Sequence, residues 1–275
     1  MQKKLSENAY FVYKKEIEYL LAAIELLCEY GVNAKIREVY TEEFLNKEKD
    51  KYPLLFEVFG NVQKNYGIEL LEFLLNFEVK DFSVESYFTY IRSLPKKDIL
   101  CGVLQQPVEV IEKGLQSESE QIAFYQKNKS EFYSYFVVEA LFQKTEWLLE
   151  SLESFVVDLR TKEAEEYLNK YARDIQTWKQ KMEEGLSKEE PLKYSESLMG
   201  KTFHNRGPFA EFYFMPAIFM PIKCCRWFEE RQILIFDAVT FGQQDNQIIA
   251  DALKMLSDKT RYQILVLLKE RKSMN

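Results

Sequence analysis

The chain has few of the residues on which metal and nucleophilic sites usually depend. It contains one histidine, His204, and four cysteines in 275 residues, and no two cysteines have Cys-x-x-Cys spacing. Zinc sites and His-dependent catalytic triads need further ligands or partners at set positions, and a disulfide framework needs more cysteines. We therefore expect reduced thiols, no metal, no cofactor and no enzymatic activity.

Glycine, proline and long apolar runs are also scarce. There are 9 glycines and 7 prolines, the first residues lack the apolar core of a signal peptide, and no run reaches membrane-spanning length. Hydrophobic residues make up 47% of the chain and charged residues 29%, which is typical of globular proteins. These features predict a mainly α, cytoplasmic protein that does not enter a membrane.

The first 190 residues show helical periodicity and predict an irregular multi-helix domain that senses a signal or dimerises. Predicted helices run from Ser6 to Tyr30, closed by Gly31, and from Ser130 to about Arg160. Ser83 and Thr161 are predicted to cap further helices, because their hydroxyls can accept free backbone N–H groups. No fixed repeat period is present, so a helical solenoid is not indicated.

Residues 191–240 have a different pattern and predict a small antiparallel β element. Three short aromatic and β-branched segments begin at Ala210, Ile222 and Gln232, and the last two should form a hairpin. Within such a strand Cys224 and Cys225 would point to opposite faces, which suits neither a shared metal nor a disulfide. Aromatic stretches such as 132–136 and 209–219 could line an apolar pocket or form ordinary core.

The loop around residue 200 contains two patterns that could bind an anion. Gly200-Lys201-Thr202 is similar to the end of a phosphate-binding loop, but position 195 is Ser rather than Gly and no helix pattern follows. A tight turn that leads into the sheet is the favoured interpretation. Lys201, His204 and Arg206 could together hold a small anionic effector, although a plain surface loop explains them equally well.

The charge of the chain is unevenly distributed. From Leu253 to Asn275 there are six basic and two acidic residues, which gives a net charge of +4. The whole chain has a net charge of −7, so the residues before Leu253 together carry −11. A basic end on an acidic body suits a DNA-binding module, because phosphate contacts need Lys and Arg locally. On charge alone, an ordinary charged helix end is the simpler interpretation.

The last 27 residues predict two amphipathic helices that meet at a sharp turn. Ile249, Leu253 and Leu256 share one helix face, and Asp258 is a suitable N-cap for a second helix that buries Ile264 and Leu268. The sequence Ala-Leu-Lys-Met-Leu-Ser-Asp-Lys-Thr-Arg-Tyr-Gln-Ile-Leu-Val-Leu-Leu resembles the opening of the winged helix-turn-helix of ArsR-type bacterial transcription regulators. With the region before it, the resemblance covers roughly residues 195–272.

This resemblance implies that residues 246–275 begin a C-terminal winged helix-turn-helix, incomplete because the recognition helix would follow. Lys259, Thr260 and Arg261 are then placed for DNA-backbone contact at the start of the second helix. Such modules bind palindromic operators as homodimers. Many family members sense metals through cysteine pairs in this module, but the segment here contains no cysteine.

Two functions follow from these observations. The first is an ArsR-type transcription regulator whose N-terminal domain senses an effector or a partner, and the second is a helical protein-protein interaction scaffold without DNA binding. An enzyme ranks below both, because the sequence contains no nucleophile with a base and no cofactor loop.

Overall fold

The computed structural model describes residues 1–28, 34–62 and 66–239. Met1–Asp237 form one compact unit, and Ala238–Asn275 form a second. The predicted helix cap at Gly31, the two terminal helices within 246–275, and Lys259, Thr260 and Arg261 lie outside the described residues. The account below therefore concerns the first unit.

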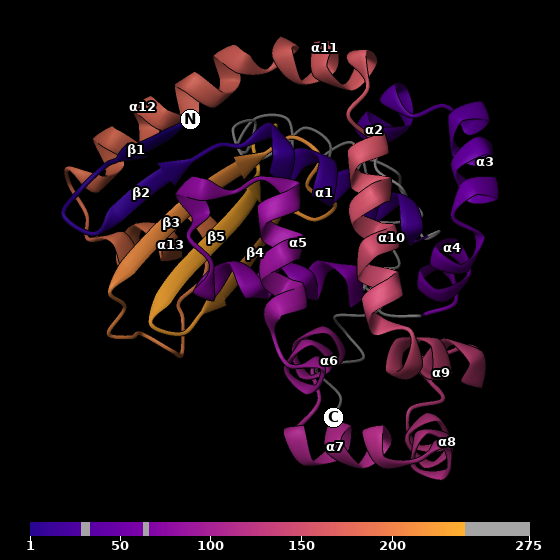
Figure 1. Cartoon of the computed structure of the whole chain (residues 1–275). Coiled ribbons are helices and arrows are strands. Elements are labelled where there is room, and N and C mark those ends of the chain that lie inside the picture. The colour runs from indigo at the N-terminus through magenta and orange to yellow at the C-terminus, as the bar shows by residue number, and fades with distance from the viewer. Residues whose placement is uncertain (29–33, 63–65, 240–275) are drawn as a thin grey trace, which may run out of the picture. The chain divides into compact units, whose positions relative to one another are not determined.

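A five-stranded sheet is formed by strands from both ends of this unit (Figure 1). Its strands are β1 (Gln2–Lys4), β2 (Ala9–Val12), β3 (Glu211–Ala217), β4 (Cys224–Phe228) and β5 (Arg231–Asp237), in the order β1-β2-β3-β5-β4. The three central strands, β2, β3 and β5, are parallel, while the outer strands pair antiparallel. All three parallel strands therefore end at the same edge of the sheet.

Helices make up most of the remaining described chain. Their bounds are α1 (Lys15–Leu27), α2 (Ala34–Val39), α3 (Glu42–Lys51), α4 (Pro53–Gly60), η1 (Tyr66–Asn76), η2 (Val79–Asp81), α5 (Val84–Ser93), α6 (Lys96–Leu104), α7 (Val108–Gln116), α8 (Glu118–Lys127), α9 (Tyr135–Gln143), α10 (Thr145–Asp158), α11 (Lys162–Lys170), α12 (Ala172–Leu186) and α13 (Pro191–Met199). Among the described helices, none combines the length and apolar character needed to cross a membrane.

Both faces of the sheet are covered by helices. On one face Trp178 of α12 packs edge-on against Phe236, and Tyr194 of α13 packs against Phe214. On the other face η1 packs against β4 and β5, and α1 joins η1 to α4, α5 and α10. Figure 1 shows α11 and α12 arching along one side of the sheet and α6 to α9 gathered below α5 and α10. Strands covered on both sides have continuous apolar runs, as in the middle of β3 and β5, although both strands carry charged residues at their ends.

Several local predictions are confirmed. Thr161 caps α11 by accepting the N–H of Ala164, and Ser83 caps α5 in a reciprocal capping box with Ser86. The hairpin of β4 and β5 is present, with Cys224 opposite Phe236 and the adjacent Cys225 opposite Ile235. Because successive strand residues point to opposite faces, the two thiols are separated as predicted.

Three predictions about the elements are wrong. The β element is mixed rather than antiparallel, and it is not confined to residues 191–240, because Ala9–Val12 pairs parallel with β3. The predicted helix from Ser6 starts only at Lys15, since the aromatic and β-branched run Ala-Tyr-Phe-Val before it forms a strand. The predicted helix over 130–160 is divided into α9 and α10 at Lys144.

The contact between α7 and α9 gives a prediction about packing. Gly114 of α7 is buried, and a methyl group on it would overlap the ring of Phe142, which is 1% exposed and packs against Phe124. Gly114→Ala gains about 1 kcal/mol of helix propensity. Overpacking costs about 1–3 kcal/mol, so we expect a net loss of up to roughly 2 kcal/mol in urea unfolding.

The control for this prediction is Lys113→Ala, on the exposed side of the same helix. That substitution should change the free energy of unfolding by no more than about 0.5 kcal/mol. If Gly114→Ala instead stabilises the protein by the full helix-propensity difference, the ring of Phe142 moves freely and the packing argument is refuted.

Candidate functional site

The residues predicted to hold an anionic effector lie in the loop between α13 and β3. Lys201, His204 and Arg206 are all exposed, and Arg206 forms an ion pair with Glu196. The carboxylate of Glu196 also accepts the N–H of Phe203, so the pair fixes the loop to the end of α13. The structure thus places His204 on a surface loop, and Arg206 is engaged in an internal contact.

Gly200 has a structural role at this position. It is the C-cap of α13, with φ +67° in the left-handed region that favours glycine. A phosphate-binding loop needs a helix that begins after its Lys-Thr pair, so that N–H groups point at the anion. Here a helix ends before that pair, which agrees with the predicted tight turn.

An arginine that the sequence reading did not single out organises the same loop. The guanidinium of Arg226 on β4 lies 3.8 Å from the ring centre of Phe203 and 4.3 Å from that of Phe228. It also donates to Gln232 Oε1 at 2.7 Å and to the carbonyl of Asn205 at 3.2 Å. Burial lowers the pKa of Arg226 to about 10, well above neutrality, so it stays charged and acts as a structural cation.

The most unusual chemistry lies where the parallel strands end. Glu18 of α1 is 1% exposed, and its carboxylate accepts the backbone N–H groups of the two residues that follow β3. The N–H of Ile218 donates to Oε1 at 2.8 Å and to Oε2 at 2.9 Å, and the N–H of Phe219 donates to Oε2 at 2.9 Å. In sheets with parallel strands, functional sites gather at this edge.

An ion pair lies beside this carboxylate. Lys35 of α2 contacts Asp237, the last residue of β5, with Nζ to Oδ1 at 2.9 Å and side-chain exposures of 15% and 7%. Lys35 and Asp237 both act electrostatically on Glu18, the first by attraction and the second by repulsion. We call Glu18, Lys35 and Asp237 the buried charge cluster. When all three groups are ionised, its net charge is −1.

The environment of Glu18 controls its protonation. Burial raises the pKa of Glu18 to about 7 from its ordinary value of 4.5, even though the N–H groups of Phe219 and Ile218 and the charge of Lys35 oppose the rise. Asp237 adds to the rise. A carboxyl group with a pKa near 7 changes charge in the physiological range, and such groups concentrate at functional sites.

Three tyrosines surround the cluster. The hydroxyl of Tyr13, just after β2, is buried and interacts with the carboxylate of Glu18. Burial, and then the charge of Glu18, raise the pKa of Tyr13. Tyr40 donates its hydroxyl to the carbonyl of Leu159 at 2.8 Å, and Tyr19 lies on α1 next to Glu18. The tyrosines therefore remain neutral and supply hydroxyl groups rather than charge.

A signal for Glu18 was present in the sequence. Every residue of α1 from Ile17 to Leu27 is buried, because its run Ile-Glu-Tyr-Leu-Leu-Ala-Ala-Ile-Glu-Leu-Leu is apolar almost all round. A helix apolar on all sides is a buried helix, and a carboxylate within it must be buried too. The partners of Glu18 gave no such signal, since they are backbone N–H groups 200 residues away.

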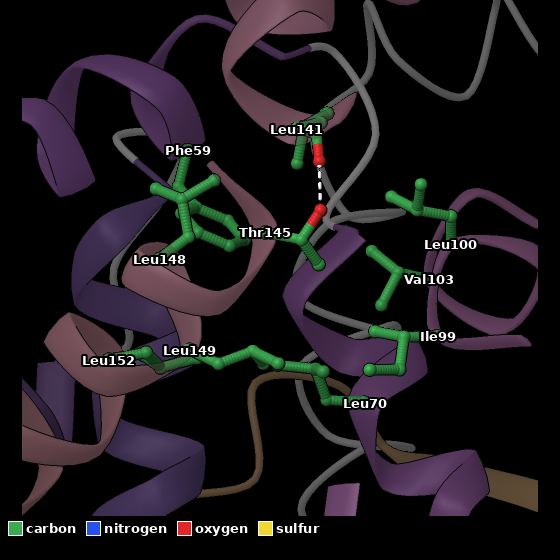
Figure 2. Close-up of a pocket in the computed structure, with 10 residues that line it drawn as sticks. All are labelled: Phe59, Leu70, Ile99, Leu100, Val103, Leu141, Thr145, Leu148, Leu149 and Leu152. Carbon is green, nitrogen blue, oxygen red and sulfur yellow. Dashed lines mark hydrogen bonds between the residues drawn. The ribbon is translucent and has the colours of Figure 1, made fainter. Parts of the chain in front are cut away.

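A separate cavity lies in the helical part of the molecule (Figure 2). It has a volume of about 30 Å³ and is lined by apolar side chains from several helices, with Thr145 as the polar exception. Figure 2 shows the hydroxyl of Thr145 bonded to the carbonyl of Leu141 one turn earlier. This volume is close to that of one water molecule in the liquid, so the cavity does not accommodate an organic effector.

The two aromatic stretches differ in burial: most of 209–219 belongs to the core, whereas in 132–136 only Phe132 is buried and Tyr133 is exposed. Phe132 is 1% exposed and Phe214 and Phe219 are fully buried, and none of these lines the cavity in Figure 2. Among the described residues, no three His, Cys, Asp or Glu side chains are grouped so that they could hold a metal ion.

Comparisons of the chain with family models, with curated proteins and with solved structures found no match. The buried charge cluster is therefore the candidate functional site on its geometry and electrostatics alone.

Proposed function

We propose that the chain is a DNA-binding transcription regulator of the ArsR type, in which residues 1–237 sense an effector or a partner. The observation that carries this proposal is the run from Ala252 to Leu268, with its Ala-Leu pair, capping Asp258 and Thr-Arg pair in family order. The basic charge of this end is a second support. A third is the division of the chain after Asp237, which puts the whole run in the second unit.

The mechanism follows from the symmetry of such regulators. Two copies would bind the two halves of a palindromic operator, and the spacing of their modules would set the affinity. A signal that favours one conformation of the body would shift the population of dimers with the correct spacing. The buried charge cluster is placed to contribute, because Asp237 is the last residue of the first unit.

The test is a mobility-shift assay with the protein as its gene encodes it and a fragment of its own promoter at moderate salt. The proposal expects a sequence-dependent shift, because the family resemblance assigns base reading to a helix that follows the matched residues. The proposal is refuted if the protein shifts the promoter fragment and unrelated DNA equally, or if it shifts no DNA.

Arg261 provides a sharper prediction within this proposal. Arg261→Ala should weaken binding to all DNA sequences by a similar factor and reduce the slope of log affinity against log salt by about 1, because one phosphate contact is lost. The matched control is Arg173→Ala on the exposed side of α12, which removes the same charge from the body. Equal slopes for both variants would contradict a DNA contact by Arg261.

A protein-protein interaction scaffold is the second candidate, and one observation favours it. Trp147 at the start of α10 is 43% exposed beside a surface hollow of about 730 Å³ that also includes Leu54 and Gln143. Exposed tryptophans are frequent anchors of protein interfaces. The scaffold explanation is preferred if two results are found together. The protein does not bind its promoter fragment, and Trp147→Ala loses the partners that the unmodified protein pulls down from its native cell extract.

A further inference from the structure

Glu18 joins three parts of the chain that are distant in sequence. Its backbone belongs to α1, its carboxylate is held by the N–H groups that follow β3, and its electrostatic neighbours Lys35 and Asp237 lie on α2 and at the end of β5. Any movement that gives water access to Glu18 must separate α1 from the end of β3. The carboxylate of Glu18 therefore connects α1 to the edge of the sheet.

Ionisation of Glu18 makes this connection less favourable electrostatically. In the interior, an ionised Glu18 is attracted by Lys35 and repelled by Asp237. Burying an ionised carboxylate is costly, and the N–H groups of Ile218 and Phe219 offset only part of that cost. A neutral Glu18 avoids that cost.

We propose that Glu18 is a proton-controlled latch, closed when its carboxyl group is neutral and destabilised when it is ionised. In the closed state it holds α1 to the end of β3, beside the Lys35–Asp237 pair at the end of β5. In the ionised state, conformations in which water reaches the carboxylate become more populated.

The direction of the pH effect follows from proton linkage. The folded protein holds the Glu18 proton up to a pKa of about 7, whereas an open or unfolded chain releases it near the ordinary value of 4.5. The contribution of this group to stability is thus complete below 4.5 and decreases as the pH rises toward 7, above which it is constant. Opening that exposes Glu18 should become roughly 100-fold more frequent across this range.

The charged and titratable neighbours predict how this midpoint moves. Lys35 favours the ionised form of Glu18, so Lys35→Met should raise the pH at which Glu18 titrates, and Asp237→Asn should lower it. Tyr19 and Tyr40 remain neutral throughout, because electrostatic and burial effects raise the pKa of both.

The first experiment compares the melting temperature of the 275-residue chain and of Glu18→Gln between about pH 5 and pH 8.5. Glutamine is a neutral mimic of the protonated acid, so the variant should gain several degrees relative to the unmodified chain as the pH rises through about 7. Glu184→Gln, on the exposed side of α12, is the matched control and should give a curve parallel to that of the unmodified chain. If Glu18→Gln also runs parallel, the latch does not exist.

The second experiment does not depend on whether Glu18→Gln folds. Carboxyl-carbon NMR follows the titration of Glu18 in the unmodified chain, Lys35→Met and Asp237→Asn, and amide exchange follows Ile218 and Phe219. Midpoints that move up in the first variant and down in the second, with faster opening of both amides at high pH, support the latch. A midpoint near 4.5, or opening that is independent of pH, overturns it.

These measurements use the protein without DNA, so the latch stands or fails independently of the proposed function. If both hold, operator affinity will follow the protonation of Glu18.

Discussion

Lys35→Met is expected to lower the free energy of unfolding by about 3–5 kcal/mol at pH 8 and by less at pH 5, because the variant removes the cation that contacts the buried Asp237. Ionised Glu18 lies close by and makes the loss larger at high pH. At pH 5 a protonated Glu18 no longer repels Asp237. Urea unfolding at the two pH values measures the difference.

A double substitution separates the ion pair from the packing of its side chains. Lys35→Met combined with Asp237→Leu replaces both partners by apolar groups, and such replacements of buried pairs are often neutral or stabilising. We expect the double variant to recover most of the stability lost in Lys35→Met. If the two single losses simply add, Lys35 and Asp237 do not act as a pair.

Phe155→Ala is expected to destabilise the helical part by about 3–5 kcal/mol. Phe155 of α10 is fully buried, and its ring packs edge-on against Tyr52 at 5.8 Å and Phe56 at 5.3 Å between ring centres. Removal of the ring leaves a cavity and breaks the aromatic pairs that join α10 to Tyr52 and to Phe56 of α4.

The control lies two residues further along α10. Val157 is 37% exposed, and Val157→Ala should change stability by no more than about 0.5 kcal/mol in either direction. Chemical unfolding monitored by tryptophan fluorescence compares the two. A loss below about 1 kcal/mol for Phe155→Ala would show that the neighbouring side chains close the cavity.

Features defined by a few neighbouring residues were predictable from the sequence. Ser83 and Thr161 act as caps because a hydroxyl reaches an N–H three residues ahead, and the β4 and β5 hairpin needs only a short polar turn. The break at Lys144 was missed because the apolar pattern continues through it, while the backbone of Lys144 leaves the helical region at φ −114° and ψ 24°. The placement of Lys259, Thr260 and Arg261 stays a prediction.

Features that depend on parallel pairing were not predictable. Such strands need a long connection, so the neighbours of Ala9–Val12 carry no nearby sign of their partner. The same holds for the candidate site. The buried position of Glu18 can be read from its helix, but the N–H groups and the aspartate that set its chemistry come from residues 218, 219 and 237.

The insertion of β2 beside β3 has a consequence for biosynthesis. A ribosome adds about 5–20 residues per second, so the 200 residues between the two strands take roughly 10 to 40 s to emerge. During that interval the first strands have no parallel partner, and the helices between them can form first because their contacts are local. The sheet then closes as a late step of high contact order, and the nascent amino terminus must stay out of other strand pairings until that moment.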